Sequence, residues 1–155
     1  MNLLFDTNIL INISRDKSEH KVLDFVNPKL KDVYVSYVSI AEIESIAFQN
    51  TWSSRKIKRI ESFLEEVQII EIDDTLLKTY VNIDAFSQRK HQNFTEYSFS
   101  TPRNMGKNDL WIASTASLLN LALITTDGDF DHLESHYITL NKILPEQLQS
   151  IMTVK

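Results

Sequence analysis

The chain has 155 residues, and its 21 acidic residues outnumber its 16 basic ones, which gives a formal net charge of −5. It contains no cysteine, which excludes disulfides, thiolate metal sites and a cysteine nucleophile. Its two glycines exclude both a glycine-rich dinucleotide fingerprint and a phosphate-binding P-loop. The acidic balance, taken alone, argues against nucleic acid as a partner.

Length and composition predict one globular domain over 1–155, with a core over about 1–140 and a short C-terminal helix and tail over 141–155. The longest run without charged residues, 110–126, contains several hydroxyl and amide side chains, so we expect no membrane partner. The N-terminus lacks the basic region of a signal peptide. We therefore expect a cytoplasmic protein.

Predicted strands and helices alternate along the chain. In order, we expect a strand at 2–5, a helix at 18–26, a strand at 32–36, helices around 40–47 and 57–67, a strand at 67–72, a helix at 75–90, a polar and aromatic loop at 91–107, a helix at 109–121, strands at 122–126 and 137–140, and a short helix from Pro145. This order predicts an α/β fold with a mostly parallel central sheet and helices on both faces.

Four carboxylates are expected at one edge of this sheet. Asp6 follows the first strand directly, and Glu42 lies in the first turn of the helix after the second strand. The helix that starts at Asp109 and the strand that ends before Asp127 have matching lengths of about 18 and 17 Å. Both acids therefore return to the edge where the carboxyl ends of parallel strands meet, which is where functional groups gather.

Each carboxylate also has a purely structural interpretation. Ser39 and Glu42 fit a helix capping box, Asp109 fits a helix cap or a partner of the helix dipole, and Asp127 fits a turn. Asp6 is harder to explain in this way, because a carboxylate after a buried strand is costly unless it is paired or metal-bound. Agreement among all four positions favours a common site.

A divalent cation would remove the repulsion between such closely packed carboxylates. Mg²⁺ and Mn²⁺ prefer oxygen ligands, and they activate water for the hydrolysis of phosphodiesters. This chemistry needs no cysteine, no histidine and no glycine-rich loop. Without the four site carboxylates, 17 acids face 16 bases, so the charge that first argued against nucleic acid becomes compatible with it.

Four segments resemble the signatures of PIN-domain ribonucleases, and within that family the chain looks most like the VapC-type toxins of toxin–antitoxin pairs. The segments are Asp6–Leu10, Ser39–Glu42, Asn108–Ala113 and Thr125–Phe130. Their order and spacing fit from the first residue to about residue 140, or about nine-tenths of the chain. The resemblance implies a three-layer α/β/α sandwich and cleavage of RNA that depends on Mg²⁺ or Mn²⁺.

The resemblance also implies roles for individual residues. By position, Asp6, Asp109 and Asp127 would hold the metal, with Asp129 as an additional candidate ligand. Glu42 would complete the catalytic pocket or orient the attacking water.

Hydrogen bonds that support the ligands would come from Asn8 and Thr126. The family further implies a homodimer that joins two active sites in one groove, and inhibition by a cognate antitoxin protein. The segment 91–107 departs from the family, because it is longer than in the compact toxins, and it bears on substrate choice and on the toxin role.

Basic and aromatic residues supply further candidates for RNA contact. The densest basic cluster consists of Arg55, Lys56, Lys58 and Arg59. It would contact RNA or an antitoxin, or else form the solvated face of a helix. Arg103 and Lys107 precede Asp109, and we expect Lys107 to contact a phosphate. The loop residues Phe94, Tyr97 and Phe99 would stack on unpaired bases, pin the loop to the domain or form a dimer contact.

Two alternatives to a nuclease are kept. In a phospho-accepting receiver domain, Asp73 or Asp74 would accept the phosphoryl group, with Asp6 as its acidic partner and Lys142 as the cation. That interpretation leaves Glu42 and the other carboxylates unexplained. The second alternative is a PIN fold used as a binding scaffold without catalysis.

Overall fold

The structure is a computed structural model, and it describes residues 1–153; residues 154–155 of the expected C-terminal tail lie outside the described part. Its elements, in chain order, are β1 (Leu3–Phe5), α1 (Thr7–Arg15), α2 (Lys21–Val26), β2 (Val33–Ser36), α3 (Tyr37–Gln49), α4 (Ser54–Glu65), β3 (Gln68–Ile70), the 3-10 turn η1 (Asp74–Leu76), α5 (Leu77–Ser87), α6 (Lys107–Leu118), β4 (Ala122–Thr125), the 3-10 turn η2 (Gly128–Leu133), β5 (Thr139–Lys142) and α7 (Pro145–Thr153).

The five strands form one parallel sheet in the order β3-β2-β1-β4-β5, which confirms the predicted α/β class. The first strand is central: β2 and β3 are added on one side of β1, and β4 and β5 are added on its other side. This order places the carboxyl ends of β1 and β4 side by side, at the kind of switch point where α/β sheets carry their sites.

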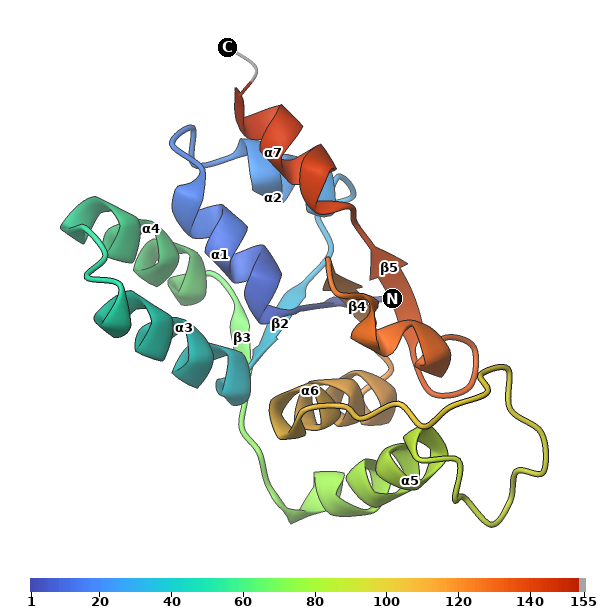
Figure 1. The fold of residues 1–155 in the computed structure, drawn as a ribbon. Helices are drawn as coiled ribbons and strands as arrows, with labels where there is room; N and C mark the ends of the chain where they lie inside the picture. Colours follow the sequence, from blue (N-terminus) through green and yellow to red (C-terminus); the bar gives the residue numbers. More distant parts are fainter. Residues whose placement is uncertain (154–155) are drawn as a thin grey trace.

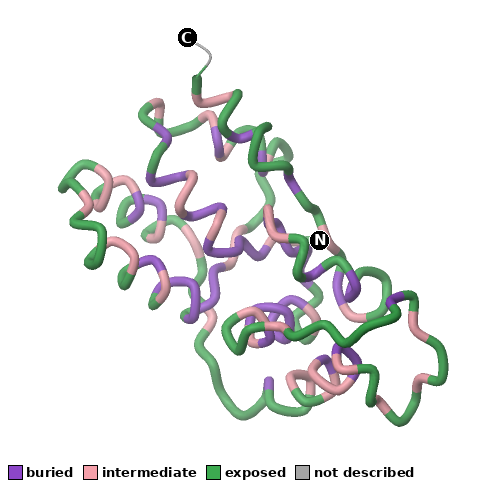
Figure 2. Tube along the Cα trace, in the orientation of Figure 1, coloured by how far each residue is buried: buried purple, intermediate pink, exposed green. Residues whose placement is uncertain are grey.

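Two cores cover the two faces of the sheet (Figure 1). Side chains alternate along a strand, so Leu4 faces a core built with α5 and α6, whereas Phe5 faces a core built with α1, α2, α4 and α7. Leu148 of α7 is fully buried in the second core. Figure 2 shows the buried positions concentrated along the sheet and on the inward faces of the helices.

Helix α1 is absent from the predicted elements. It begins directly after β1, with Asp6 as its N-cap, and its apolar positions Ile9, Leu10 and Ile13 are buried at helical spacing. Other boundaries differ by a few residues. The third strand is confined to Gln68–Ile70, and the last one starts at Thr139, two residues later than expected.

The long connection between α5 and α6 packs against the domain through aromatic rings. Phe94, Tyr97 and Phe99 all contact the buried ring of Phe86, with ring centroids 4.8, 5.3 and 5.5 Å away. Of the alternatives for these aromatic residues, the structure supports pinning of the loop. No helix within residues 1–153 is long and apolar enough to cross a bilayer.

Candidate active site

Asp6 lies at the carboxyl end of the central strand, and only 4% of its surface is exposed. Each of its carboxylate oxygens accepts one hydrogen bond. The backbone N–H of Thr7 donates to Oδ1 at 2.8 Å, and the Thr125 hydroxyl donates to Oδ2 at 2.7 Å. The side chain is therefore held in one orientation at the start of α1.

Thr125 was not among the predicted site residues, which included its neighbour Thr126. It ends β4 beside β1, and its hydroxyl also accepts a hydrogen bond of 3.0 Å from the backbone N–H of Asp127. The motif around Asp127 marked this segment, but side chains on a strand alternate in direction, so a shift of one residue decides which threonine reaches Asp6.

Glu42 is held from α1. The Thr7 hydroxyl donates a hydrogen bond of 2.9 Å to its Oε1. The expected capping box is wrong, because α3 starts at Tyr37 and its N-cap is Ser36, whose side chain accepts from the backbone N–H of Val38 at 3.2 Å. Glu42 therefore lies one turn inside α3 and is free of a capping role.

Three further carboxylates converge beside these two. Single carboxylate oxygens of Asp109, Asp127 and Asp129 lie within 4.8 Å of one another. Asp109 is in the first turn of α6, and Asp127 is the N-cap of η2, where its side chain accepts from the backbone N–H of Asp129 at 2.9 Å. Asn8 lies half-buried in the first turn of α1, where its carbonyl accepts from the Asn12 side chain.

The electrostatics of the site connect all five carboxylates. Burial, followed by repulsion from Glu42 and Asp127, raises the pKa of Asp6 to about 6, although hydrogen bonds from Thr125 and Thr7 oppose the shift. Burial also raises the pKa of Asp109 to about 7, and the charges of Asp6, Asp127, Glu42 and Asp129 add to the effect in that order. Within residues 1–153, no lysine, arginine or histidine forms an ion pair with these five.

This donor set suits a hard divalent cation. The ligand atoms are carboxylate oxygens, they are close enough to share one ion, and no cationic side chain in residues 1–153 forms an ion pair with them. The same residues provide no thiolate or imidazole that would favour a softer metal.

The basic residues predicted to contact RNA lie in two separate regions, one next to the carboxylates and one far from them. Lys107 begins α6 two residues before Asp109 and is exposed, and Arg103 lies on the preceding loop with its guanidinium 6.0 Å from the Phe99 ring centroid. The cluster at 55–59 is remote from the carboxylates, because it lies in the first turns of α4, against the far end of α1.

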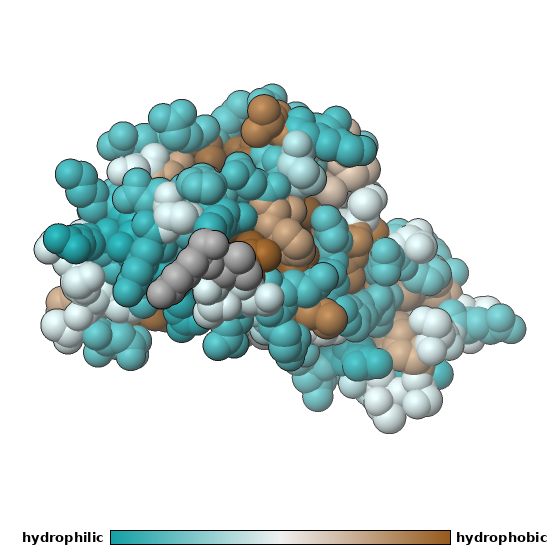
Figure 3. Space-filling model, turned by 90° about the horizontal axis from the view of Figure 1, so that it is seen from above, coloured by the Kyte–Doolittle hydropathy of each residue, from teal (hydrophilic) through white to brown (hydrophobic). Residues whose placement is uncertain are grey.

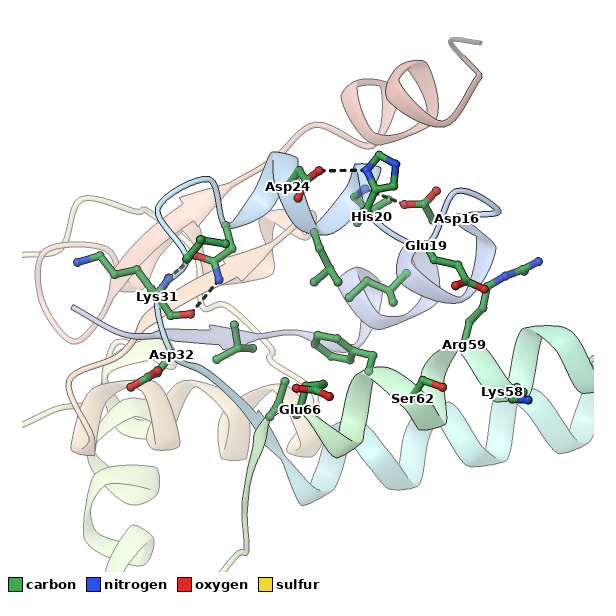
Figure 4. A pocket seen from close by; sticks show the side chains of 18 of the residues that line it. Asp16, Glu19, His20, Asp24, Lys31, Asp32, Lys58, Arg59, Ser62 and Glu66 are labelled. Carbon is green, nitrogen blue, oxygen red and sulfur yellow. Dashed lines mark hydrogen bonds and ion pairs between the residues drawn. The ribbon is translucent and has the colours of Figure 1, made fainter.

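A separate groove of ≈ 1110 Å³ runs between α1, α2 and α4 (Figure 4). Apolar side chains such as Ile13, Leu23 and Phe63 line it. Its rim carries charges of both signs, with Lys58 and Arg59 on the α4 side and Asp24 on α2.

The phosphoryl acceptor proposed for a receiver domain lies away from the carboxylate site. Asp73 follows the edge strand β3, and two strand positions separate it from Asp6 on the central strand. Its carboxylate accepts hydrogen bonds from the backbone and hydroxyl of Thr75, as the N-cap of η1. This acid therefore has a structural role that leaves it outside the carboxylate site.

Comparisons with known proteins identify the family and the fold. The PIN domain family matches residues 3–135. Among solved structures, VapBC2 from Rickettsia felis bound to a promoter DNA fragment is 19% identical, with a TM-score of 0.71 over 92% of this chain and 98% of that one. VapBC-1 from nontypeable Haemophilus influenzae is 23% identical, with a TM-score of 0.68 over 92% and 98%.

FitAcB from Neisseria gonorrhoeae is 21% identical, with a TM-score of 0.68 over 89% of this chain and 95% of that one. No curated protein matches the chain in sequence. The family match covers most of the chain and includes all five converging carboxylates. The chain therefore belongs to the PIN domain family.

Proposed function

We propose that this protein is a divalent-metal-dependent endoribonuclease and the toxin of a toxin–antitoxin pair. The observation that carries the proposal is the convergence of Asp6, Glu42, Asp109, Asp127 and Asp129 at the switch point of a PIN-domain sheet. Membership of a family of nucleases supports hydrolysis of phosphodiesters, and the solved toxin–antitoxin complexes of the same fold support the toxin role.

Asp6, Asp109 and Asp127 would hold Mg²⁺ or Mn²⁺, with Asp129 as a further ligand. When bound, the cation supplies a Lewis acid that activates water and offsets the charge of the reacting phosphate. The protein itself fixes the ligands, since Thr125 links Asp6 to the backbone at Asp127. Thr126 and Asn8 stay proposed as further supporting residues.

Glu42 is proposed to orient the attacking water. Its Oε1 is occupied by the Thr7 hydroxyl, which leaves Oε2 to accept a hydrogen bond from water in the pocket. Lys107 and Arg103 would contact RNA phosphates beside the site, because Lys107 lies at the start of α6, where the helix dipole also favours an anion, and Arg103 lies on the loop that leads into it.

An antitoxin is the proposed protein partner, acting in the cytoplasm. Similar structures include toxin–antitoxin complexes, and the groove between α1, α2 and α4, which combines apolar and charged side chains, has the size to take a helical segment of a partner.

A homodimer is proposed from exposed apolar side chains around the edge strand β3. These are Tyr37 in α3, Ile69 and Ile72 at β3, and Leu77 and Val81 in α5. Several large apolar side chains exposed around one edge of the sheet support an interaction surface there.

The test is cleavage of single-stranded RNA with Mg²⁺ or Mn²⁺ and with EDTA. We expect cleavage only with the cation, and its loss in Asp6→Asn and Asp109→Asn proteins that keep the wild-type circular dichroism spectrum. Asp73→Asn removes an exposed acid elsewhere and should leave cleavage intact. Cleavage in EDTA, or full activity in both site variants, would overturn the proposal. Wild-type protein that binds RNA without cleaving it would favour the scaffold alternative.

A further inference from the structure

A second concave surface lies at the opposite end of α1 from the carboxylate site. It encloses ≈ 540 Å³, and its lining consists of two serines and five cationic side chains. These are Ser14, Arg15, Lys17, Ser53, Arg55, Lys56 and Arg59, which we call the cationic pocket. No carboxylate lines it, but Lys17, Arg55 and Arg59 also line the adjoining groove between α1, α2 and α4, whose lining includes acids.

The cations of the cationic pocket form no ion pair in the part of the chain that the structure describes. Within residues 1–153 no ion pair joins Arg15, Lys17, Arg55 or Lys56 to an acid. Asp16 stands between two of the cations in the sequence, but its carboxylate is directed to the start of α2, where it accepts hydrogen bonds from the backbone N–H groups of Ser18 and Val22.

One contact joins the two walls of the pocket, and another positions Lys56 at the start of α4. Nη1 of Arg59 donates a hydrogen bond of 3.0 Å to the Ser14 carbonyl, which joins α4 to the end of α1. The ammonium of Lys56 lies 4.0 Å from the Trp52 ring centroid. Burial lowers the pKa of Lys56, and the charges of Arg15 and Arg59 lower it further. The repulsion is therefore built into packed elements and would be relieved by an anion.

The start of α4 adds a second source of positive potential. Ser53 is its N-cap and lines the pocket, so the first turn of this 12-residue helix lies beside the cations. The Ser53 hydroxyl accepts a hydrogen bond of 3.3 Å from the backbone N–H of Lys56, and the positive end of the helix dipole adds to the charge of the pocket. Figure 3 looks down on this end of the molecule, where hydrophilic side chains crowd the region of α1 and α4.

We propose that the cationic pocket binds the phosphate backbone of the RNA strand outside the cleavage site. The inference rests on the proposed nuclease function. Phosphates suit the pocket because they are anions of a size that guanidinium groups and helix N-termini both bind. Asp6 caps one end of the nine-residue α1 and Arg15 ends the other, so the two sites are separated by about 14 Å along the helix. A strand spans that separation with a few nucleotides, since nucleotides with stacked bases advance by ~3.4 Å each along the strand axis.

This location also explains how a chain of net charge −5 would gain affinity for RNA. The carboxylate site repels a polyanion unless metal is bound, so affinity must come from a surface of opposite sign. An RNA segment held at the pocket would keep the strand near the carboxylates after one phosphodiester bond is cleaved and before the next one enters the site.

The experiment measures binding of a fluorescein-labelled oligouridylate of about 12 nucleotides by fluorescence anisotropy, as a function of salt, in Mg²⁺ buffer. The Asp109→Asn background prevents cleavage during the titration. Arg15→Gln/Arg55→Gln removes two exposed cations that make no structural hydrogen bond in residues 1–153. Each lost phosphate contact should reduce the slope of log K against log salt by about 0.7, so we expect a reduction of about 1.4.

The matched control is Lys78→Gln/Lys90→Gln, which removes the same charge from an exposed position in α5 and an exposed position just after it. Its slope should stay within experimental error of the parent. Equal slopes for both double variants would overturn the proposal. The same holds if the Arg15 and Arg55 variant keeps the parent slope with RNA and loses binding to a partner protein. Failure of the nuclease function would appear separately, as absence of cleavage by the wild-type protein in the same buffer.

Discussion

The hydroxyl of Thr125 donates a hydrogen bond of 2.7 Å to the carboxylate of Asp6, a residue 119 positions away in the sequence. The same oxygen accepts a hydrogen bond from the backbone of Asp127. One buried side chain thus connects the acids that follow two neighbouring strands. Their relative position is fixed by β1, β4 and this threonine before any cation binds.

We expect Thr125→Val to weaken both stability and cleavage. Valine has nearly the shape of threonine but leaves a buried Asp6 oxygen without its donor, which costs about 1–3 kcal/mol of unfolding free energy. Urea unfolding and initial cleavage rates measure the two effects, and Thr125→Ser should restore most of both. A larger loss of cleavage in Thr126→Val than in Thr125→Val would contradict the assignment of this contact.

The response to Mg²⁺ should depend on pH. The pKa of Asp6 is raised to about 6 and that of Asp109 to about 7. Between pH ~4 and ~7 the folded protein therefore holds protons that the unfolded chain has lost, so the metal-free fold loses stability as pH rises. A cation binds the ionised carboxylates, so the gain in Tm on adding Mg²⁺ should be larger at about pH 8 than at about pH 5.

Comparison of melting curves with Mg²⁺ and with EDTA at each pH isolates this effect. Burial lowers the pKa of His132 to about 4, and this histidine makes stability rise with pH over the same range. Its contribution is the same with and without metal and cancels in the difference. A gain in Tm that is equal at both pH values, or larger at low pH, would argue against a cation on these carboxylates.

Much of the carboxylate site follows from the sequence because parallel strands share an edge. Asp6 and Asp127 each follow a buried strand, and Asp109 lies in the first turn of the helix that leads into the second of these strands. Such positions converge whatever the detailed packing, provided that the strands are neighbours. The sheet order, with β1 between β2 and β4, meets this condition.

Other features depend on geometry that the sequence pattern leaves open. Helix α1 escaped prediction because Asn8 and Asn12 interrupt its apolar pattern, although they occupy its half-buried side. The choice between Thr125 and Thr126 turns on one residue of strand register. The location of Arg55 and its neighbours turns on how α4 packs against α1, which only tertiary contacts decide.

The aromatic cluster under the long loop should be a major source of stability. Phe86 is almost fully buried, and rings from the loop and from the segment after η2 surround it, including Tyr137 at 5.2 Å. Phe86→Ala should reduce the unfolding free energy by about 3–5 kcal/mol. Phe48→Ala is the control, because 88% of that side chain is exposed and its loss should cost less than about 0.5 kcal/mol.

Limited proteolysis gives this prediction a second readout. If the cluster pins the loop, Phe86→Ala should speed cleavage between residues 88 and 106 more than elsewhere. Equal stability and equal rates of proteolysis for the wild type and Phe86→Ala would mean that other contacts hold the loop. One such contact is the hydrogen bond from the Arg103 backbone N–H to the Ser87 carbonyl.

The proposed dimer makes the surface around β3 sensitive to charge. Leu77 and Val81 lie one turn apart on α5, and both side chains are more than half exposed, as is that of Leu144 beyond the other edge strand. Burial of such side chains in an interface stabilises association, whereas a buried carboxylate opposes it. We expect light scattering to give a dimeric mass for the wild type and a monomeric mass for Val81→Asp. Leu144→Asp adds the same charge outside the proposed interface and should stay dimeric, so monomers in both variants or in the wild type would contradict this interface.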